Sequence, residues 1–255
     1  MTEARGVVDV DIWRVQLDGS LPDGAWTILS DAERERARRM RPPAWRHDFA
    51  LSHYATREIL GGYTATDPAA LEFHRGAHGK PKAAGPVEFS LSHTQGLALV
   101  AVSTAEVGVD AEVTGQAQVA EGLIARCLTA VEQAAVQDDV AAGNDTTTAF
   151  LRYWTAKESY LKGLGIGLAE PLENVEVRWD GNASARVARS GATDQRWVLH
   201  TLEAGPHHVA TLAVKTAWPD ITVSVRYLDF CLPGRDRRLR RPVPGASARM
   251  AAARA

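Results

Sequence analysis

A chain of 255 residues, 45% of them hydrophobic, is long enough to bury a sizeable core and too apolar to be a disordered polymer. Its formal charge of -2 conceals a basic end, because residues 233–255 carry seven Arg and one Asp (net +6), which leaves -8 on residues 1–232. Such local basic character is not that of a bulk nucleic-acid binder, and no apolar run of about 18 residues suggests a membrane-spanning helix.

The cysteines and the N-terminal residues indicate in which cellular compartment the protein is expected to work. Cys127 and Cys231 stand far apart in the chain, which fits a reducing environment. The first residues lack the charged region and the following apolar region of a secretory signal. We therefore expect a cytoplasmic protein that binds neither membranes nor nucleic acid.

The first half predicts strands around two helices. Apolar and polar residues alternate from Val7 to Leu17, as in a half-buried strand. Ser30 and Glu33 form the capping-box pattern that starts a helix. The other expected elements are a helix over 49–60 and strands over 87–92, 97–103 and 107–112.

The second half predicts two helices followed by strands. Thr129 and Glu132 repeat the capping-box pattern, and a long helix over 146–164 is expected to stop in the glycine-rich stretch 163–167. Strands are expected near 174–179, 184–189, 196–203, 207–216 and 221–229. Residues from 233 onward are rich in Arg, Ala and Pro without apolar periodicity and are expected to be flexible.

Three short segments recur at offsets of 99, 100 and 112 residues. The pairs are residues 29–33 with 128–132, 54–58 with 154–158, and 98–104 with 210–216. Chance explains any single match, because capped helices and Ala-Val strands look alike, but three matches in one order favour a duplication. A duplicated chain would place its site in the cleft between the halves.

Asp110 and Glu112 end an apolar strand and, being two residues apart, point to the same face. Neighbouring carboxylates repel each other unless a proton or a cation lies between them, so the pair suits a hard cation such as Mg²⁺. Two solvated acids at a strand end explain the pair equally well when it is considered alone.

Trp154, Glu158 and Lys162 are spaced four residues apart on the long predicted helix and share one face. Glu158 and Lys162 could be an exposed ion pair, but the tryptophan on the same stripe indicates a partly buried face. Together with Asp110 and Glu112, Glu158 would complete a magnesium site of three carboxylates.

Phosphate-binding groups gather upstream. The predicted strand that contains Ser92 ends at His93, which brings hydroxyls, amides and an imidazole together. A serine hydrolase is not favoured, because neighbours on a strand point to opposite faces and no Gly-x-Ser-x-Gly motif surrounds Ser92. Lys80 lies in a turn, and Arg41 and Arg46 lie near the early helices. Arginine binds phosphate bidentately, although arginines on a helix are more often solvated.

Four motifs in this order resemble the 4′-phosphopantetheinyl transferase superfamily, in its two-lobed surfactin-synthetase type. They are His78-Gly-Lys-Pro, Phe89-Ser-Leu-Ser-His-Thr, Gly108-Val-Asp-Ala-Glu and Trp154-Thr-Ala-Lys-Glu-Ser-Tyr-Leu-Lys. Each motif is weak alone, whereas the ordered set is specific, and the likeness spans about residues 30–230.

The resemblance implies an α+β fold. The expected form is a pseudo-dimer of two similar α/β lobes, each a small antiparallel-rich sheet packed with helices, with the active site in the cleft between the lobes. The lobes would be residues 1–105, which contact the adenosine and phosphate end of the cofactor, and 106–232, which carry the metal site. A flexible tail, 233–255, would follow.

The resemblance also implies substrates and residue roles. Coenzyme A would give its 4′-phosphopantetheine group to a serine of an apo carrier protein (acyl, polyketide or peptidyl), releasing 3′,5′-ADP. Asp110, Glu112 and Glu158 would hold Mg²⁺, and Glu158 and Lys162 would be catalytic. Cofactor contacts would come from Arg41, Arg46, Lys80, Ser92, His93, Lys157 and Lys162. The carrier would dock near Val113–Leu128 on an enzyme expected to be a monomer.

Two other functions fit the same residues. A magnesium-dependent phosphohydrolase could use the three carboxylates to activate water, and a non-catalytic protein could keep the fold to bind coenzyme A or a carrier. The three acids and Lys162 argue against a pure binder, because binding alone does not require crowded carboxylates. The arginine-rich tail could steer an acidic partner toward the protein or could be only a solubilising end.

Overall fold

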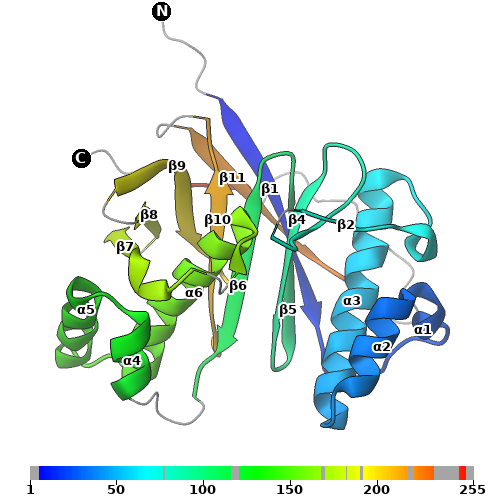
Figure 1. The fold of residues 1–255 in the computed structure, drawn as a ribbon, viewed down its shortest axis with the longest axis horizontal. Helices are drawn as coiled ribbons and strands as arrows, with labels where there is room; N and C mark the ends of the chain where they lie inside the picture. Colours follow the sequence, from blue (N-terminus) through cyan, green and yellow to red (C-terminus); the bar gives the residue numbers. More distant parts are fainter. Residues whose placement is uncertain are drawn as a thin grey trace, which may run out of the picture.

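The computed structural model describes residues 6–76, 78–115, 121–167, 170–181, 183–189, 192–217, 221–232 and 247–250. Within them the chain forms two five-stranded sheets and a small hairpin, with helices on the outer side of each large sheet (Figure 1). This mixed arrangement confirms the expected α+β class.

The first sheet has the strand order β12-β11-β1-β5-β4. Its strands are β1 (Val7–Gln16), β4 (Glu88–Thr94), β5 (Leu97–Ser103), β11 (Thr222–Asp229) and β12 (Ser247–Met250). β5 is antiparallel to both β1 and β4, whereas β11 runs parallel to β1. β11 therefore returns to the sheet that the beginning of the chain builds.

The first half also supplies helices and a hairpin. They are α1 (Ala25–Ile28), α2 (Asp31–Arg39), α3 (Pro43–Thr64), the 3-10 turn η1 (Pro68–Ala70), β2 (His74–Arg75) and β3 (Pro81–Lys82). The predicted capping box of Ser30 and Glu33 starts α2. α3 begins at Pro43, earlier than the predicted residue 49, because the fixed φ and missing N–H of proline suit a first helical turn.

The second sheet is antiparallel, with the order β6-β10-β9-β8-β7. Its strands are β6 (Val107–Val113), β7 (Val175–Asp180), β8 (Ser184–Arg189), β9 (Ala192–Thr201) and β10 (His208–Lys215). The accompanying helices are α4 (Glu121–Cys127), α5 (Ala130–Ala141), α6 (Thr146–Leu164) and the 3-10 turn η3 (Leu172–Asn174). Thr129 and Glu132 cap α5 as predicted, and α6 ends at Gly165, whose φ of 79° favours glycine.

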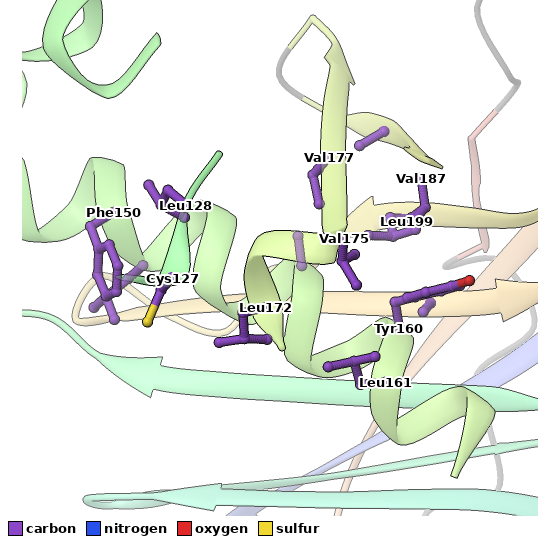
Figure 2. Packing of buried hydrophobic residues seen from close by; sticks show 14 of the residues in the cluster. Cys127, Leu128, Phe150, Tyr160, Leu161, Leu172, Val175, Val177, Val187 and Leu199 are labelled. Atoms are coloured by element: carbon purple, nitrogen blue, oxygen red, sulfur yellow. The ribbon is translucent and has the colours of Figure 1, made fainter. Parts of the chain in front are cut away.

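Three clusters of buried side chains hold these layers together. One packs α3 against the first sheet. Another, which includes Phe150 and Tyr160, packs α6 against the second sheet (Figure 2). The third lies between the sheets and includes Leu99 from the first and Leu212 from the second. This packing brings β4 of one sheet beside β6 of the other.

The expected flexible tail falls mostly outside the described residues. Four of its residues, Ser247–Met250, form β12 beside β11, which differs from the expectation. The physical reason is that an open sheet edge readily accepts another extended segment. Among the described helices, none is long and apolar enough to cross a membrane.

Candidate active site

A pocket of about 540 Å³ lies where α3, β4, β6 and α6 meet. From the first half it is lined by Arg36, Phe49, His53, residues 78–81 and residues 89–93. From the second half it is lined by Asp110, Glu112, Trp154, Glu158, Lys162, Gly165 and Gly167. The pocket therefore gathers the three predicted carboxylates with Lys162, Lys80, Ser92 and His93.

Asp110 on β6 has two oxygens in unequal environments. Oδ1 accepts hydrogen bonds from the Lys162 ammonium at 2.6 Å and from the Ser92 hydroxyl at 2.9 Å. Oδ2 is buried and has no hydrogen-bond partner within the described part of the chain. A desolvated oxygen without a donor is unfavourable unless a ligand satisfies it, so Asp110 is suited to bind one.

Two hydroxyls of β4 hold the neighbouring strand β6 in place, although the strands belong to different sheets. Ser90 Oγ accepts from the Val109 N–H at 3.1 Å, and Ser92 Oγ accepts from the Ala111 N–H at 3.2 Å. Serines two residues apart on a strand share a face, which explains the spacing. Because Ser92 also donates to Asp110, it positions that acid at the pocket wall.

Glu112 and Glu158 share the pocket with Asp110, and the three acids repel one another. Burial, followed by the charge of Asp110, raises the pKa of both glutamates, while Lys162 acts in the opposite direction. Oε1 of Glu158 is buried and lacks a hydrogen-bond partner among the described residues. The negative charge of these three groups thus exceeds what one ammonium compensates, which favours a cation or a proton.

The fit of Mg²⁺ to these residues rests on their oxygen chemistry. In the described parts of the chain, no three His, Cys, Asp or Glu side chains form a ready metal-binding cluster, and Lys162 pairs with Asp110. Carboxylate oxygens are nevertheless the hard ligands that Mg²⁺ prefers. Asp110 and Glu158 each offer a buried oxygen without a partner among the described residues. The donor set therefore fits the ion.

β6 and α6 approach each other at a point where only glycine fits. A Cβ added to Gly108 would lie 1.9 Å from the Ser159 carbonyl oxygen and 2.4 Å from the Gly163 nitrogen. This contact fixes the distance between the strand that carries Asp110 and the helix that carries Glu158.

Lys80 also holds β6 and α6 together. Its ammonium donates to the carbonyl oxygens of Val107 at 2.8 Å and Gly163 at 3.1 Å. Burial lowers the pKa of Lys80, although the charge of Glu88 acts in the opposite direction. Lys80 lines the pocket, as a cofactor contact requires, but its ammonium is bonded to the backbone of β6 and α6.

The structure does not bring Lys157 to the pocket. Its ammonium is 0% exposed and bonds the Glu132 carboxylate at 2.6 Å and the carbonyl oxygens of Cys127 at 2.8 Å and Leu172 at 3.0 Å. Consecutive residues on a helix lie about 100° apart, so Lys157 and Glu158 face different sides of α6. Lys157 therefore has a structural role, which corrects the expected cofactor contact.

Both of the expected arginine contacts also lie off the pocket wall. Arg41 is exposed in the short segment between α2 and α3, and Arg46 donates to the Met40 carbonyl oxygen at 3.1 Å. Neither side chain lines the pocket, whereas Arg36 on α2 does. Arg36 was not selected from the sequence, although it lines the pocket.

Phe49 and His53 were also missed. The Arg36 guanidinium lies 5.3 Å from the Phe49 ring centroid, and the His53 ring lies 4.0 Å from it. His93 meets Phe49 edge-on at 6.3 Å. Desolvation, followed by the positive charges of His53 and Lys162, lowers the pKa of His93 to about 4, so its ring is neutral at pH 7. The four-residue spacing of Phe49 and His53 on α3 is the one signal that could have paired them.

A pocket that combines carboxylates able to hold a divalent cation with a lysine suits a phosphate-bearing ligand. The profile of the 4′-phosphopantetheinyl transferase superfamily matches residues 106–213. The chain is 34% identical to the 4′-phosphopantetheinyl transferase HetI of a Nostoc species, over 81% of this chain and 87% of that protein. It is 25% identical to the 4′-phosphopantetheinyl transferase Sfp of Bacillus subtilis, over 80% of this chain and 89% of that protein.

A third relative, a phosphopantetheinyl transferase of a Thraustochytrium species, is 26% identical over 81% of this chain and 78% of that protein. The chain belongs to the 4′-phosphopantetheinyl transferase superfamily. It is an enzyme of that type, which confirms the family expected from the four motifs.

Proposed function

We propose that the enzyme transfers the 4′-phosphopantetheine group from coenzyme A to a serine hydroxyl of an apo carrier protein and releases 3′,5′-ADP. The observation that carries the proposal is the pocket in which Asp110, Glu112 and Glu158 lie with Lys162. Crowded carboxylates suit a site that holds Mg²⁺ against a diphosphate, and Mg²⁺ is usually bound by carboxylates together with substrate phosphates.

In the proposed reaction the serine Oγ attacks the β-phosphorus of coenzyme A. The bond between that phosphorus and the oxygen bridging to the α-phosphate breaks, and 3′,5′-ADP leaves with this oxygen. Mg²⁺, held by Asp110, Glu112 and Glu158, would neutralise charge on the diphosphate. Glu158, or a water beside it, would accept the serine proton, because a carboxylate next to both the metal and the incoming hydroxyl is suitably placed.

Lys162 and the β4 residues complete the proposed site. The Lys162 side chain is 30% exposed, so its ammonium can reach a phosphate while it stays paired with Asp110. There it would neutralise charge on the reacting group. His93 and Lys80 line the wall from the first half, where we place the nucleotide end of coenzyme A.

We further propose that residues 1–105 and 106–232 are two similar lobes of a duplicated unit, with the active site between them. A repeated buried ion pair supports this. Glu33 caps α2 and accepts from Arg57 Nε on α3 at 2.7 Å. Glu132 caps α5 and lies 2.6 Å from Lys157 Nζ on α6. Both cations also donate to two backbone carbonyl oxygens.

The proposed carrier docks beside Val113–Leu128, which follows the strand that carries Asp110 and Glu112. Residues 116–120 of this segment lie outside the described residues, and α4 forms its last part. We expect the enzyme to act as a monomer in the cytoplasm, where Cys127 and Cys231, both free thiols, would stay reduced.

Mass spectrometry of an apo carrier protein incubated with the enzyme, Mg²⁺ and coenzyme A tests the proposal. We expect the carrier to gain one phosphopantetheine group on its serine, with 3′,5′-ADP in equal amount. Hydrolysis of coenzyme A without modification of the carrier would instead identify a phosphohydrolase. Binding without either product would identify a non-catalytic protein.

A further inference from the structure

His53 on α3 lines the pocket but lies outside the motifs that indicated the function. Its side chain is 22% exposed, so it is neither a core residue nor a freely solvated one. Its ring lies against Phe49, which also contacts the Arg36 guanidinium and the edge of His93. Two imidazoles and a guanidinium therefore gather around one phenyl ring at one wall of the pocket.

Glu33 sets the orientation of His53. Oε1 of Glu33 lies 3.2 Å from His53 Nδ1, while Oε2 accepts from Arg57 Nε at 2.7 Å and from the Ser30 N–H at 2.8 Å. Desolvation opposes ionisation, but hydrogen bonds from His53 and Ser30 prevail and lower the pKa of Glu33 to about 2. The ionised carboxylate keeps a proton on Nδ1, which leaves Nε2 as the nitrogen available to a ligand.

The second half of the chain shows that the ion pair beneath His53 does not need a histidine. There Glu132 pairs with Lys157 and accepts from the Val177 N–H at 2.7 Å. The residue at the offset of 100 from His53 is Tyr153, whose ring instead packs edge-on against Trp179 at 6.5 Å. His53 therefore occurs only in the first of the two similar units, where it lines the pocket.

We propose that His53, oriented by Glu33, binds a phosphate group of coenzyme A as an imidazolium, so that the affinity for the cofactor falls as the pH rises and the ring loses its proton. A charge-assisted hydrogen bond from a cationic ring is well suited to a phosphate oxygen. The identity of the ligand rests on the proposed function, whereas the anion-binding chemistry rests on the geometry of the wall.

Charged and titratable groups lie on the elements packed around His53. They are Glu33 and Arg36 on α2, Asp48 and Arg57 on α3, His93 on β4, and Lys162 on α6 across the pocket. An arriving phosphate adds negative charge on the ligand side, which favours proton uptake when the cofactor binds.

Calorimetric titration of coenzyme A into the full-length enzyme with Mg²⁺, at several pH values from 6 to 8, tests the proposal. We expect His53→Ala to weaken binding about tenfold at pH 6 and to flatten the decline toward pH 8. His53→Lys, which stays charged, should keep tight binding at pH 8. Because the phosphates of coenzyme A titrate in every experiment, the difference between variants isolates His53.

Parallel titrations with 3′-dephospho-coenzyme A locate the contact. Loss of affinity for coenzyme A alone assigns His53 to the 3′-phosphate, and equal loss for both ligands assigns it to the diphosphate; either result supports the proposal. His207→Ala, in an exposed turn before β10, is the control and should bind like the wild type. Thermal unfolding checks that each variant folds.

The proposal is overturned if His53→Ala binds coenzyme A with wild-type affinity and the same pH dependence. A wild-type enzyme that binds coenzyme A in a His53-dependent way but modifies no carrier would contradict the proposed function alone. A wild-type enzyme that modifies carriers while His53 has no effect on binding would contradict this inference alone.

Discussion

Glu158 combines a functional position with an unfavourable environment. It is buried beside Asp110, and both burial and that charge raise its pKa. A carboxyl group whose pKa is higher in the folded than in the unfolded state binds its proton more tightly when folded. Its contribution to stability is therefore present at low pH and is lost as the pH rises through the folded pKa. Once ionised, the group destabilises the fold.

Glu158→Gln should therefore stabilise the free enzyme. We expect a melting temperature about 2–4 °C higher at pH 7, corresponding to about 1 kcal/mol, because the variant has no buried charge to desolvate. The gain should shrink as the pH falls, because the wild-type side chain then becomes protonated itself. Thermal unfolding without Mg²⁺ from pH 4 to 8 measures this. A lower melting temperature than the wild type at pH 7 would contradict the argument.

At the scale of elements, the contact between β6 and α6 determines how far apart the acidic residues of the site lie. Gly108→Ala places a methyl group 1.9 Å from the Ser159 carbonyl oxygen, so the strand and helix must separate. We expect a loss of about 3 kcal/mol or more in the free energy of unfolding, together with loss of transfer. Gly122→Ala on α4, with nothing within 4 Å of its added Cβ, is the matched control. If both variants unfold at the same denaturant concentration, the contact is not critical.

Substitution of Lys157 distinguishes a structural role of this residue from a contact with the cofactor. Lys157→Met leaves Glu132 buried without its cation, and we expect a loss of about 3–5 kcal/mol in the free energy of unfolding. The Kd for coenzyme A, measured at a temperature where the variant is folded, should stay unchanged because Lys157 does not line the pocket. A large rise in that Kd without loss of stability would restore the cofactor contact.

Local signals account for what the sequence predicted well. Ser30 with Glu33 and Thr129 with Glu132 start helices through contacts three residues apart, and the glycine at 165 ends α6 where expected. The pairing of strands that are distant in the sequence could not be predicted from local patterns. Nothing in Thr222–Asp229 indicates that it pairs in parallel with β1, more than two hundred residues away. Lys157 was expected at the pocket only because of the family resemblance, and its burial against Glu132 is a tertiary contact that no local pattern reveals.

On the scale of the whole molecule, β11 joins the end of the described chain to its beginning. Val223 and Val225 of β11 are buried in the cluster between the two sheets. Each such side chain contributes about 1.5–3 kcal/mol by burial, and a typical domain has only about 5–15 kcal/mol in total.

Truncation should therefore have sharply different effects on either side of β11. Removal of residues 218–255 deletes β11, and we expect a chain that does not fold cooperatively. Removal of residues 233–255 keeps β11 and should lower the melting temperature by only a few degrees. Circular dichroism during thermal unfolding distinguishes the two. A cooperative transition in the shorter chain would show that the return of β11 is dispensable.

As a ligand of Mg²⁺ and the acceptor of the serine proton, Glu158 is expected to take part in the transfer itself and not in holding the fold together. Single-turnover transfer to an apo carrier, measured for Glu158→Gln at saturating coenzyme A and Mg²⁺, addresses it directly. We expect a rate at least about 100-fold lower in a variant that is at least as stable as the wild type. An unchanged rate constant would contradict it.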